Sequence, residues 1–265
     1  MSDLTVTPRA QSLLVPGAAL AAVAAAAAAA WIALAARMAG MDMGPGGDPG
    51  ALGWFALTWA LMTAAMMLPA SAPAVARLAR GRRAEAAAAA VLFLAGYAAV
   101  WLLAGLAAYG VVESLRALHA GVLGWSSAGR YLAAAGIVAA GLYQLTAVKR
   151  RWLARCIAPE LPAPGRGPAA TLRAGLEHGG CCVACCWTLM VALYALGMMS
   201  LMWTAVVTVL IVSERVLRPP AAIARGVAVV LIVLGIAVAA APASLPGLTI
   251  PAMTSAGMPA QSSAG

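Results

Sequence analysis

Long apolar runs recur along this chain and constrain its fold more than any other feature. The five clearest runs cover residues 13–36, 51–74, 86–112, 128–148 and 221–241. A helix of about 20 apolar residues crosses the hydrocarbon core of a bilayer. The runs are continuously apolar rather than alternating, and a spanning segment must satisfy its own backbone hydrogen bonds. The sequence therefore predicts an all-α fold, a polytopic transmembrane helix bundle.

The composition supports this prediction and excludes a soluble class of protein. Hydrophobic residues make up 64% of the chain and charged residues only 9%, whereas soluble domains use about 25% charged residues. The net charge of +9 resides in short loops rather than on one compact face, so we expect no nucleic-acid partner. The expected surrounding is the lipid bilayer, and the expected location is the cell inner membrane, crossed several times.

The distribution of basic residues predicts the orientation. Arginines and a lysine follow the second and fourth runs, and one arginine precedes the first run. Cytoplasmic loops of membrane proteins carry an excess of Lys and Arg. These positions predict a cytoplasmic amino terminus.

A sixth apolar run, residues 181–212, leaves the number of spans open between six and seven. As one helix its 32 residues would extend about 48 Å, beyond the roughly 30 Å of the core. A hairpin at residues 196–200 would leave 14 of the 17 basic residues inside, against 11 for a single crossing. The charge rule therefore favours the hairpin and seven spans, although its arms of about 15 residues are short for a crossing.

The chain shows a single domain. We expect one transmembrane helical domain over residues 1–242, with an irregular cytoplasmic loop at about 150–180, where prolines and glycines concentrate. Residues 243–265 are polar and uncharged and are predicted to be a disordered tail.

Four of the five cysteines lie within six residues: Cys181, Cys182, Cys185 and Cys186. On a helix they fall within an arc of about 140°, so they can converge. Thiolates are soft ligands that suit Cu(I), Zn(II) or iron–sulfur centres. The alternative is that small cysteines serve tight helix packing, but four in one place favour a metal site.

Further donors are predicted from other parts of the chain. His178 lies one turn before the cysteines, although Gly179 and Gly180 make helical continuation there uncertain. Met66 and Met67 offer thioethers, which also suit copper. Cys156 could supply a further thiol. Glu214 is a candidate because carboxylates within a membrane are usually functional.

The order of several motifs resembles a known family. The motifs are A-M-M-x-P at residues 65–69, Y-Q-L-T-x-x-K at 143–149, C-x-x-C-C-W-x-L-M at 182–190, G-M-M at 197–199 and Glu214. Over residues 50–215 the chain resembles the uncharacterised family of predicted metal-binding integral membrane proteins. The resemblance implies a cysteine-based metal site in a membrane protein. Ala184 occupies a position where the family has glycine, which leaves the proposed ligands unchanged.

The sequence therefore predicts a membrane protein that binds a soft metal ion at a cytoplasmic-side cysteine cluster, for handling, transfer or sensing of the metal. Copper is favoured, with zinc and iron left open, and a metallochaperone or metalloenzyme is the expected kind of partner. Met38, Met41, Met43, Met253 and Met258 would suit copper capture on the far side. No nucleotide-binding signature is present, and the prediction leans against an enzyme.

Two other functions remain open from the sequence. The first is a membrane thiol-disulfide oxidoreductase in which Cys182 and Cys185, a C-x-x-C pair, cycle between dithiol and disulfide. A reducing cytoplasmic side argues against a stable disulfide there. The second is a non-catalytic assembly subunit with packing cysteines.

Overall fold

A computed structural model describes residues 8–39, 50–79, 83–119, 129–163, 166–197 and 200–242. Within these residues the secondary structure is entirely helical, which confirms the all-α prediction. The eight helices of the described chain are α1 (Pro8–Met38), α2 (Leu52–Leu78), α3 (Arg83–His119), α4 (Arg130–Gln144), α5 (Ala147–Ile157), α6 (Pro168–Gly197), α7 (Leu201–Val216) and α8 (Pro220–Ala240). The predicted tail, Met41, Met43, Met253 and Met258 lie outside the described residues.

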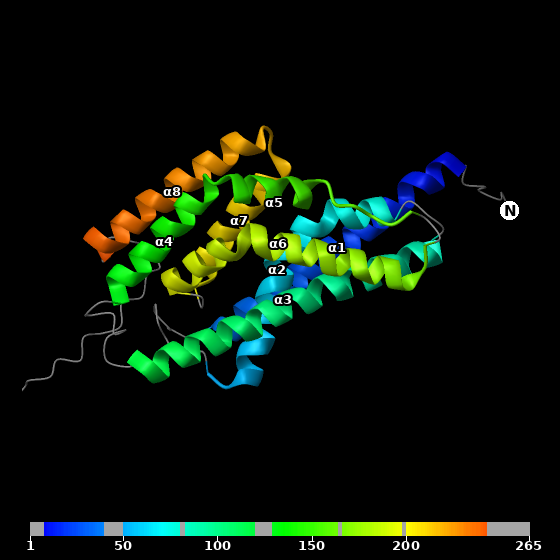
Figure 1. The fold of residues 1–265 in the computed structure, drawn as a ribbon. Coiled ribbons are helices and arrows are strands. Elements are labelled where there is room, and N and C mark those ends of the chain that lie inside the picture. The colour runs from blue at the N-terminus through cyan, green and yellow to red at the C-terminus, as the bar shows by residue number, and fades with distance from the viewer. Residues whose placement is uncertain are drawn as a thin grey trace, which may run out of the picture.

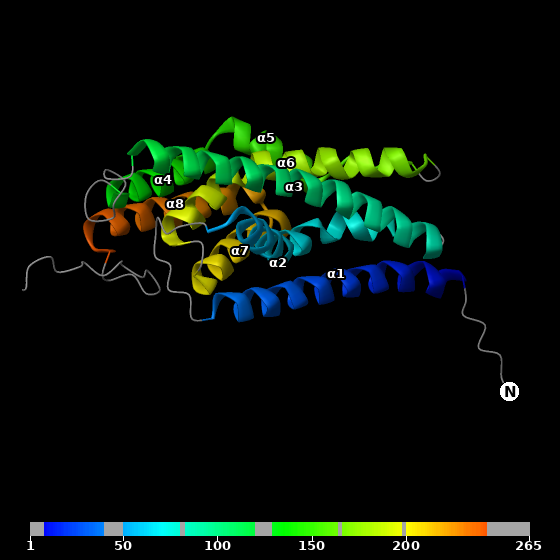
Figure 2. The same cartoon turned by 90° about the horizontal axis from the view of Figure 1, so that it is seen from below.

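The helices associate chiefly in three pairs. The most extensive packing is of α4 on α8, of α3 on α6 and of α1 on α2 (Figure 1). Helix α2 also contacts α3 and α7, so it lies between α1 and the rest of the bundle (Figure 2). The main apolar core draws on all of these helices and contains the buried cysteines.

Five helices are long and apolar enough to cross a membrane: α1, α2, α3, α6 and α8. The pair α4 and α5 adds a sixth span if the two are counted together, although they are bent by 68°. Helix α7 has 16 residues, which extend about 24 Å and fall short of the roughly 30 Å core. The six-span count lies within this range, and the favoured count of seven is not confirmed.

The predicted break in the sixth apolar run is present. Helix α6 ends at Gly197, whose φ of 101° is readily adopted only by glycine. Helix α7 begins after Ser200, whose side chain accepts a hydrogen bond from the backbone N–H of Trp203. Residues 181–212 are therefore two helices rather than one.

The start of α6 differs from the sequence-based prediction. The expected loop at 150–180 is shortened on both sides, because α5 continues to Ile157 and α6 begins at Pro168. Helix α6 remains continuous through Gly179 and Gly180. The cysteines consequently lie in the middle of a 30-residue helix rather than at its first turn. The prediction placed the helix start too late because Arg173, Glu177 and the glycines interrupt the apolar pattern.

The bend between α4 and α5 directs a charged residue into the bundle. Helix α4 ends at Gln144, and the Thr146 side chain caps α5 by accepting a hydrogen bond from the backbone N–H of Lys149 at 3.1 Å. The capped turn places Lys149 on the inner side of α5, where its exposed fraction is 0%. The bend thus brings an ammonium group to the cysteine-bearing helix.

Two glycines allow α3 and α6 to pack closely. A Cβ atom added at Gly96 would overlap the backbone of Leu172, and one added at Gly175 would overlap the backbone of Phe93. Glycine at both positions lets the two backbones approach, as small residues do between membrane helices. This approach sets Tyr97 of α3 against the cysteine-bearing part of α6.

Candidate metal centre

The central cysteines of α6 differ in their access to solvent. Cys182, Cys185 and Cys186 have exposed fractions of 0%, whereas Cys181 is half-buried. The three buried side chains belong to the main apolar core. Cys156, in α5, is also buried. All five cysteines are free thiols.

The buried thiols contact one another in a chain. Cys185 contacts both Cys156 and Cys186 through its side chain. Cys186 in turn contacts Cys182, four residues earlier on the same helix face. We call this series the thiol chain: Cys156, Cys185, Cys186 and Cys182. It begins on α5 at Cys156 and ends on α6 at Cys182.

A buried arginine contacts the end of the thiol chain formed by Cys182 and Cys186. Nη2 of Arg215, in α7, lies 2.7 Å from Sγ of Cys182 and 3.7 Å from Sγ of Cys186. Its Nη1 donates to the carbonyl oxygen of Ala70 at 3.3 Å, while its Nε has no hydrogen-bond partner. Among the described residues no carboxylate forms a salt bridge with Arg215. The two thiols are therefore the groups available to balance its charge.

A buried pair of opposite charges also contacts α6 at Cys185. Nζ of Lys149 donates to Oε2 of Glu214 at 2.7 Å and to the carbonyl oxygen of Cys185 at 2.9 Å. The side chains of Lys149 and Glu214 are 0% and 1% exposed. Because Lys149 neutralises Glu214, this carboxylate does not balance Arg215, and its predicted role as a metal ligand competes with the ion pair.

Aromatic side chains of α3 cover the same face of α6. The hydroxyl of Tyr97 lies 3.1 Å from Sγ of Cys182, and the Tyr97 ring stacks on the imidazole of His178 with centroids 5.5 Å apart. Phe93 packs on His178 at the same centroid distance. The predicted ligand His178 is thus close to Cys182 and lies one turn before it on the same face of α6.

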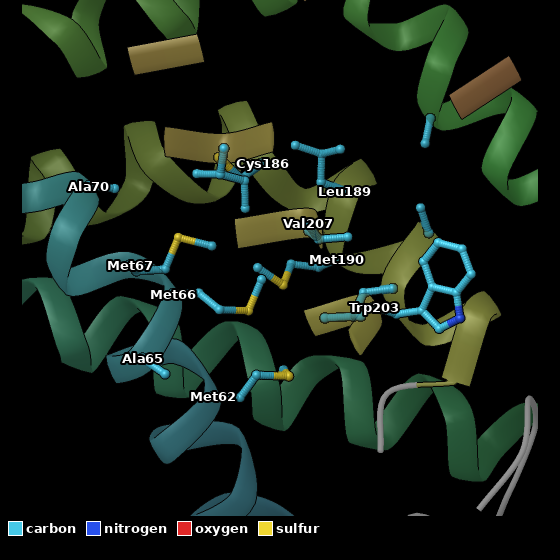
Figure 3. Packing of buried hydrophobic residues seen from close by; sticks show 14 of the residues in the cluster. Met62, Ala65, Met66, Met67, Ala70, Cys186, Leu189, Met190, Trp203 and Val207 are labelled. Atoms are coloured by element: carbon cyan, nitrogen blue, oxygen red, sulfur yellow. The ribbon is translucent and has the colours of Figure 1, made fainter. Parts of the chain in front are cut away.

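The predicted thioether donors lie in the core beside the thiols. Met66 and Met67 have exposed fractions of 0% and share the main apolar core with the buried cysteines. Figure 3 shows Met66 of α2 and Met190 of α6 pointing toward one another. Apolar packing accounts for these positions, and they also bring soft sulfur atoms near the thiol chain.

Three residues at this site were not identified as site residues from the sequence. The charge rule counts Arg215 only among the basic residues that set orientation, Lys149 enters only through the Y-Q-L-T-x-x-K motif, and no motif includes Tyr97. The sequence signal that existed for Lys149 was a charge at the end of an apolar run, since intramembrane charges are usually functional. For Tyr97 no local signal existed, because its contact depends on how α3 packs against α6.

The donor set suits a soft, monovalent ion of low coordination number. Among the described residues no three His, Cys, Asp or Glu side chains converge as a closed metal site would require. Two thiols, those of Cys182 and Cys186, instead share a contact with Arg215. Pairs of thiolates suit Cu(I), which is soft. Zinc in a structural site usually takes four ligands, which the described residues do not gather.

The fold and the site define a multispan membrane protein with a buried thiol centre held between basic side chains. The chain belongs to the PpoB2 copper chaperone family, whose model matches residues 56–238. No curated protein and no solved structure matched the chain. The family match confirms the predicted metal-binding membrane family and the favoured metal, copper, and it implies a partner that receives copper.

Proposed function

We propose that Cys182 and Cys186 bind one Cu(I) ion as a pair of thiolates beside Arg215, and that the protein hands this ion to a partner. The observation that carries the proposal is the contact of Nη2 of Arg215 with both sulfur atoms, at 2.7 and 3.7 Å. Met66 and Met67 are proposed as weaker donors that assist transfer. His178 and Glu214 are proposed as neighbours of the site rather than ligands in its resting state.

The balance of buried charge supports Cu(I) in particular. Lys149 and Glu214 neutralise each other, so Arg215 contributes one unbalanced positive charge. Cu(I) bound by two thiolates has a net charge of −1, which cancels that of Arg215. Zn(II) bound by the same two thiolates is neutral and leaves the arginine uncompensated. Because an unpaired charge in a low-dielectric interior is costly, the site favours the monovalent ion.

We further propose that the protein lies in the inner membrane with its amino terminus in the cytoplasm. The basic residues after α2, and those of α5 and the start of α6, support this orientation. Under it, α5 and the first turns of α6 face the cytoplasmic side. The proposed acceptor is a copper-requiring protein or a second copper carrier.

The test is Cu(I) binding by the purified protein under reductant and without oxygen, in competition with a chromogenic Cu(I) chelator. The parent should bind one equivalent, and Cys182→Ser and Cys186→Ser should each weaken binding at least about a hundredfold, or about 2.7 kcal/mol. Gly180→Ser is the matched control, because a side chain there meets no atom within 4 Å, and it should retain the parental affinity. If Cys182→Ser and Cys186→Ser bind copper like the parent, these two thiols are not the ligands.

A copper-free parent that instead shows a reversible disulfide between Cys182 and Cys185 would favour the thiol-disulfide oxidoreductase. In the structure, the thiol of Cys182 contacts that of Cys186, and Nη2 of Arg215 lies beside both sulfur atoms. That geometry favours metal binding by the Cys182 and Cys186 pair. The disulfide can be measured by alkylation of acid-trapped protein.

A further inference from the structure

A cavity of about 550 Å³ has Cys181 in its wall. It lies between α5, the segment that follows α5, and the first half of α6. Its walls include aromatic, charged and sulfur-bearing side chains: Trp152, Arg155, Glu160, Glu177, His178 and Cys181. We refer to it as the α5–α6 cavity.

Cys181 connects this cavity to the buried thiols. It lines the α5–α6 cavity and is half-buried, unlike the other cysteines of the chain. Cys156 of α5 interacts electrostatically with Cys181 and through its side chain with Cys185. Cys185 continues the contacts to Cys186 and Cys182. The cysteines therefore interact in series from Cys181, on the cavity wall, to the proposed copper site.

His178 supplies an independent sign that the cavity takes a ligand. Its side chain is 4% exposed, and neither Nδ1 nor Nε2 has a hydrogen-bond partner. Buried imidazole nitrogens are normally hydrogen-bonded, so these atoms retain unused capacity to bind. His178 lines the same cavity as Cys181 and lies three residues before it on α6, which puts the two on neighbouring positions of the helix surface.

We propose that the α5–α6 cavity is the place where Cu(I) is exchanged, with Cys181 as the exchange thiol and His178 as an assisting ligand. This proposal rests on the proposed function and adds a route to the same copper site. The substrate class is a Cu(I)–thiolate, whether carried by a small thiol or by a cysteine-bearing protein. Cys181 determines the rate at which copper is loaded and does not bind the ion once it has reached Cys182 and Cys186.

The exchange is a substitution at copper without oxidation or reduction. The thiol of Cys181 loses its proton and forms a bond to Cu(I) while the bond from copper to the carrier's sulfur breaks. The departing carrier thiolate takes up one proton, so the charge is balanced. Copper remains Cu(I) throughout, and the same substitution then passes it along Cys156 and Cys185 toward Cys186 and Cys182.

The test separates the rate of loading from the affinity at equilibrium. Cu(I)–glutathione and a Cu(I)-loaded protein with a C-x-x-C site are mixed in turn with the purified parent, Cys181→Ser and Gly180→Ser, and copper uptake is followed with time. Gly180→Ser is the matched control, because a side chain there meets no atom within 4 Å and leaves the thiol of Cys181 in place.

Support for the exchange thiol is a loading rate at least tenfold lower in Cys181→Ser, with either carrier, and an equilibrium affinity within twofold of the parent. A slowing with glutathione points to small-thiol exchange, and a slowing only with the protein carrier points to a protein source. His178→Phe keeps the ring packing on Phe93 and Tyr97 but removes both nitrogens. It should slow loading severalfold at unchanged affinity.

Two results overturn the proposal while leaving the proposed function intact. One is a Cys181→Ser variant that loads as fast as the parent with both carriers. The other is a loss of affinity in proportion to the loss of rate, which would make Cys181 a resting ligand. A parent that binds no Cu(I) at all would instead overturn the proposed function itself.

Discussion

Lys149 and Glu214 form an ion pair in the interior of the bundle, with 2.7 Å between Nζ and Oε2. The pair joins the first turn of α5 to the last turn of α7. Lys149 also donates to the carbonyl oxygen of Cys185, so the same ammonium group holds the middle of α6. The position of the thiols therefore depends on a contact between three helices.

Breaking this ion pair should destabilise the protein. Glu214→Gln leaves Lys149 as a buried charge without a counterion, which costs about 3–5 kcal/mol. The double variant Lys149→Met with Glu214→Gln should recover much of that loss, because no unpaired charge remains. The measurement is thermal unfolding of the detergent-solubilised protein at fixed pH.

Glu113→Gln serves as the control for the ion pair. Glu113 contacts Arg116 at 3.7 Å, but both side chains are more than a third exposed, at 44% and 38%. Exposed pairs contribute only about 0–1 kcal/mol, so this variant should unfold close to the parent. A Glu214→Gln variant as stable as Glu113→Gln would show that the buried pair does not stabilise the bundle.

Replacing Arg215 should separate stability from copper binding. Arg215→Met removes a buried charge that has no carboxylate partner among the described residues, so the copper-free protein should be at least as stable as the parent. Its Cu(I) affinity should fall at least about tenfold, or about 1.4 kcal/mol. Arg215→Lys keeps the charge and should lose less affinity. Competition for Cu(I) and thermal unfolding with and without copper measure both effects.

A different result for Arg215 would change the account of the site. If Arg215→Met retained full affinity for Cu(I), compensation of charge would not govern metal choice. If it instead bound Zn(II) more tightly than the parent while losing Cu(I), the charge argument would be strengthened.

Leucine at Met66 or Met67 should leave the fold intact, because leucine and methionine have similar volumes. Such swaps usually cost less than about 1.5 kcal/mol. If the thioethers assist transfer, each variant should lower the rate of copper release to an acceptor severalfold, with a smaller loss of affinity than Cys182→Ser. Met190→Leu, in the same core, is the packing control. If the Met66 and Met67 variants released copper as fast as the parent and Met190→Leu, these two methionines would be packing residues only.

Packing between α3 and α6 gives a further prediction. Gly175→Ala introduces a methyl group that overlaps the backbone of Phe93, and overpacking costs about 1–3 kcal/mol. Gly180→Ala, on the same helix, meets no atom within 4 Å and should be neutral or stabilising by up to about 1 kcal/mol. Thermal unfolding compares the two. Equal unfolding temperatures would contradict the close approach of the two helices.

Much of the fold could be predicted from hydropathy. The first three apolar runs and the last one correspond to α1, α2, α3 and α8, because continuous apolar sequence determines a spanning helix almost by itself. The break near Gly197 was predicted from length and charge. The boundaries of α5 and α6 were not, because polar residues and glycines on a helix reduce hydropathy without ending the helix.

The candidate site was predictable only in part. Clustering along the sequence identified Cys182, Cys185 and Cys186, since neighbouring cysteines on one helix remain close in any fold. The contact of Arg215 with Cys182 spans 33 residues and depends on how α7 packs against α6. Hydropathy and helical periodicity contain no information on that distance, so from the sequence Arg215 reads only as a charge that sets orientation.

The order of the charged residues along the chain has a consequence for biosynthesis. The ammonium of Lys149 and the carboxylate of Glu214 are 65 residues apart, so the ribosome completes the lysine-bearing helix long before its counterion exists. Until α7 emerges, the nascent chain has neither the anion for Lys149 nor the cation that contacts Cys182. The proposed copper-binding arrangement is therefore completed only after the last quarter of the polypeptide has begun to be synthesised.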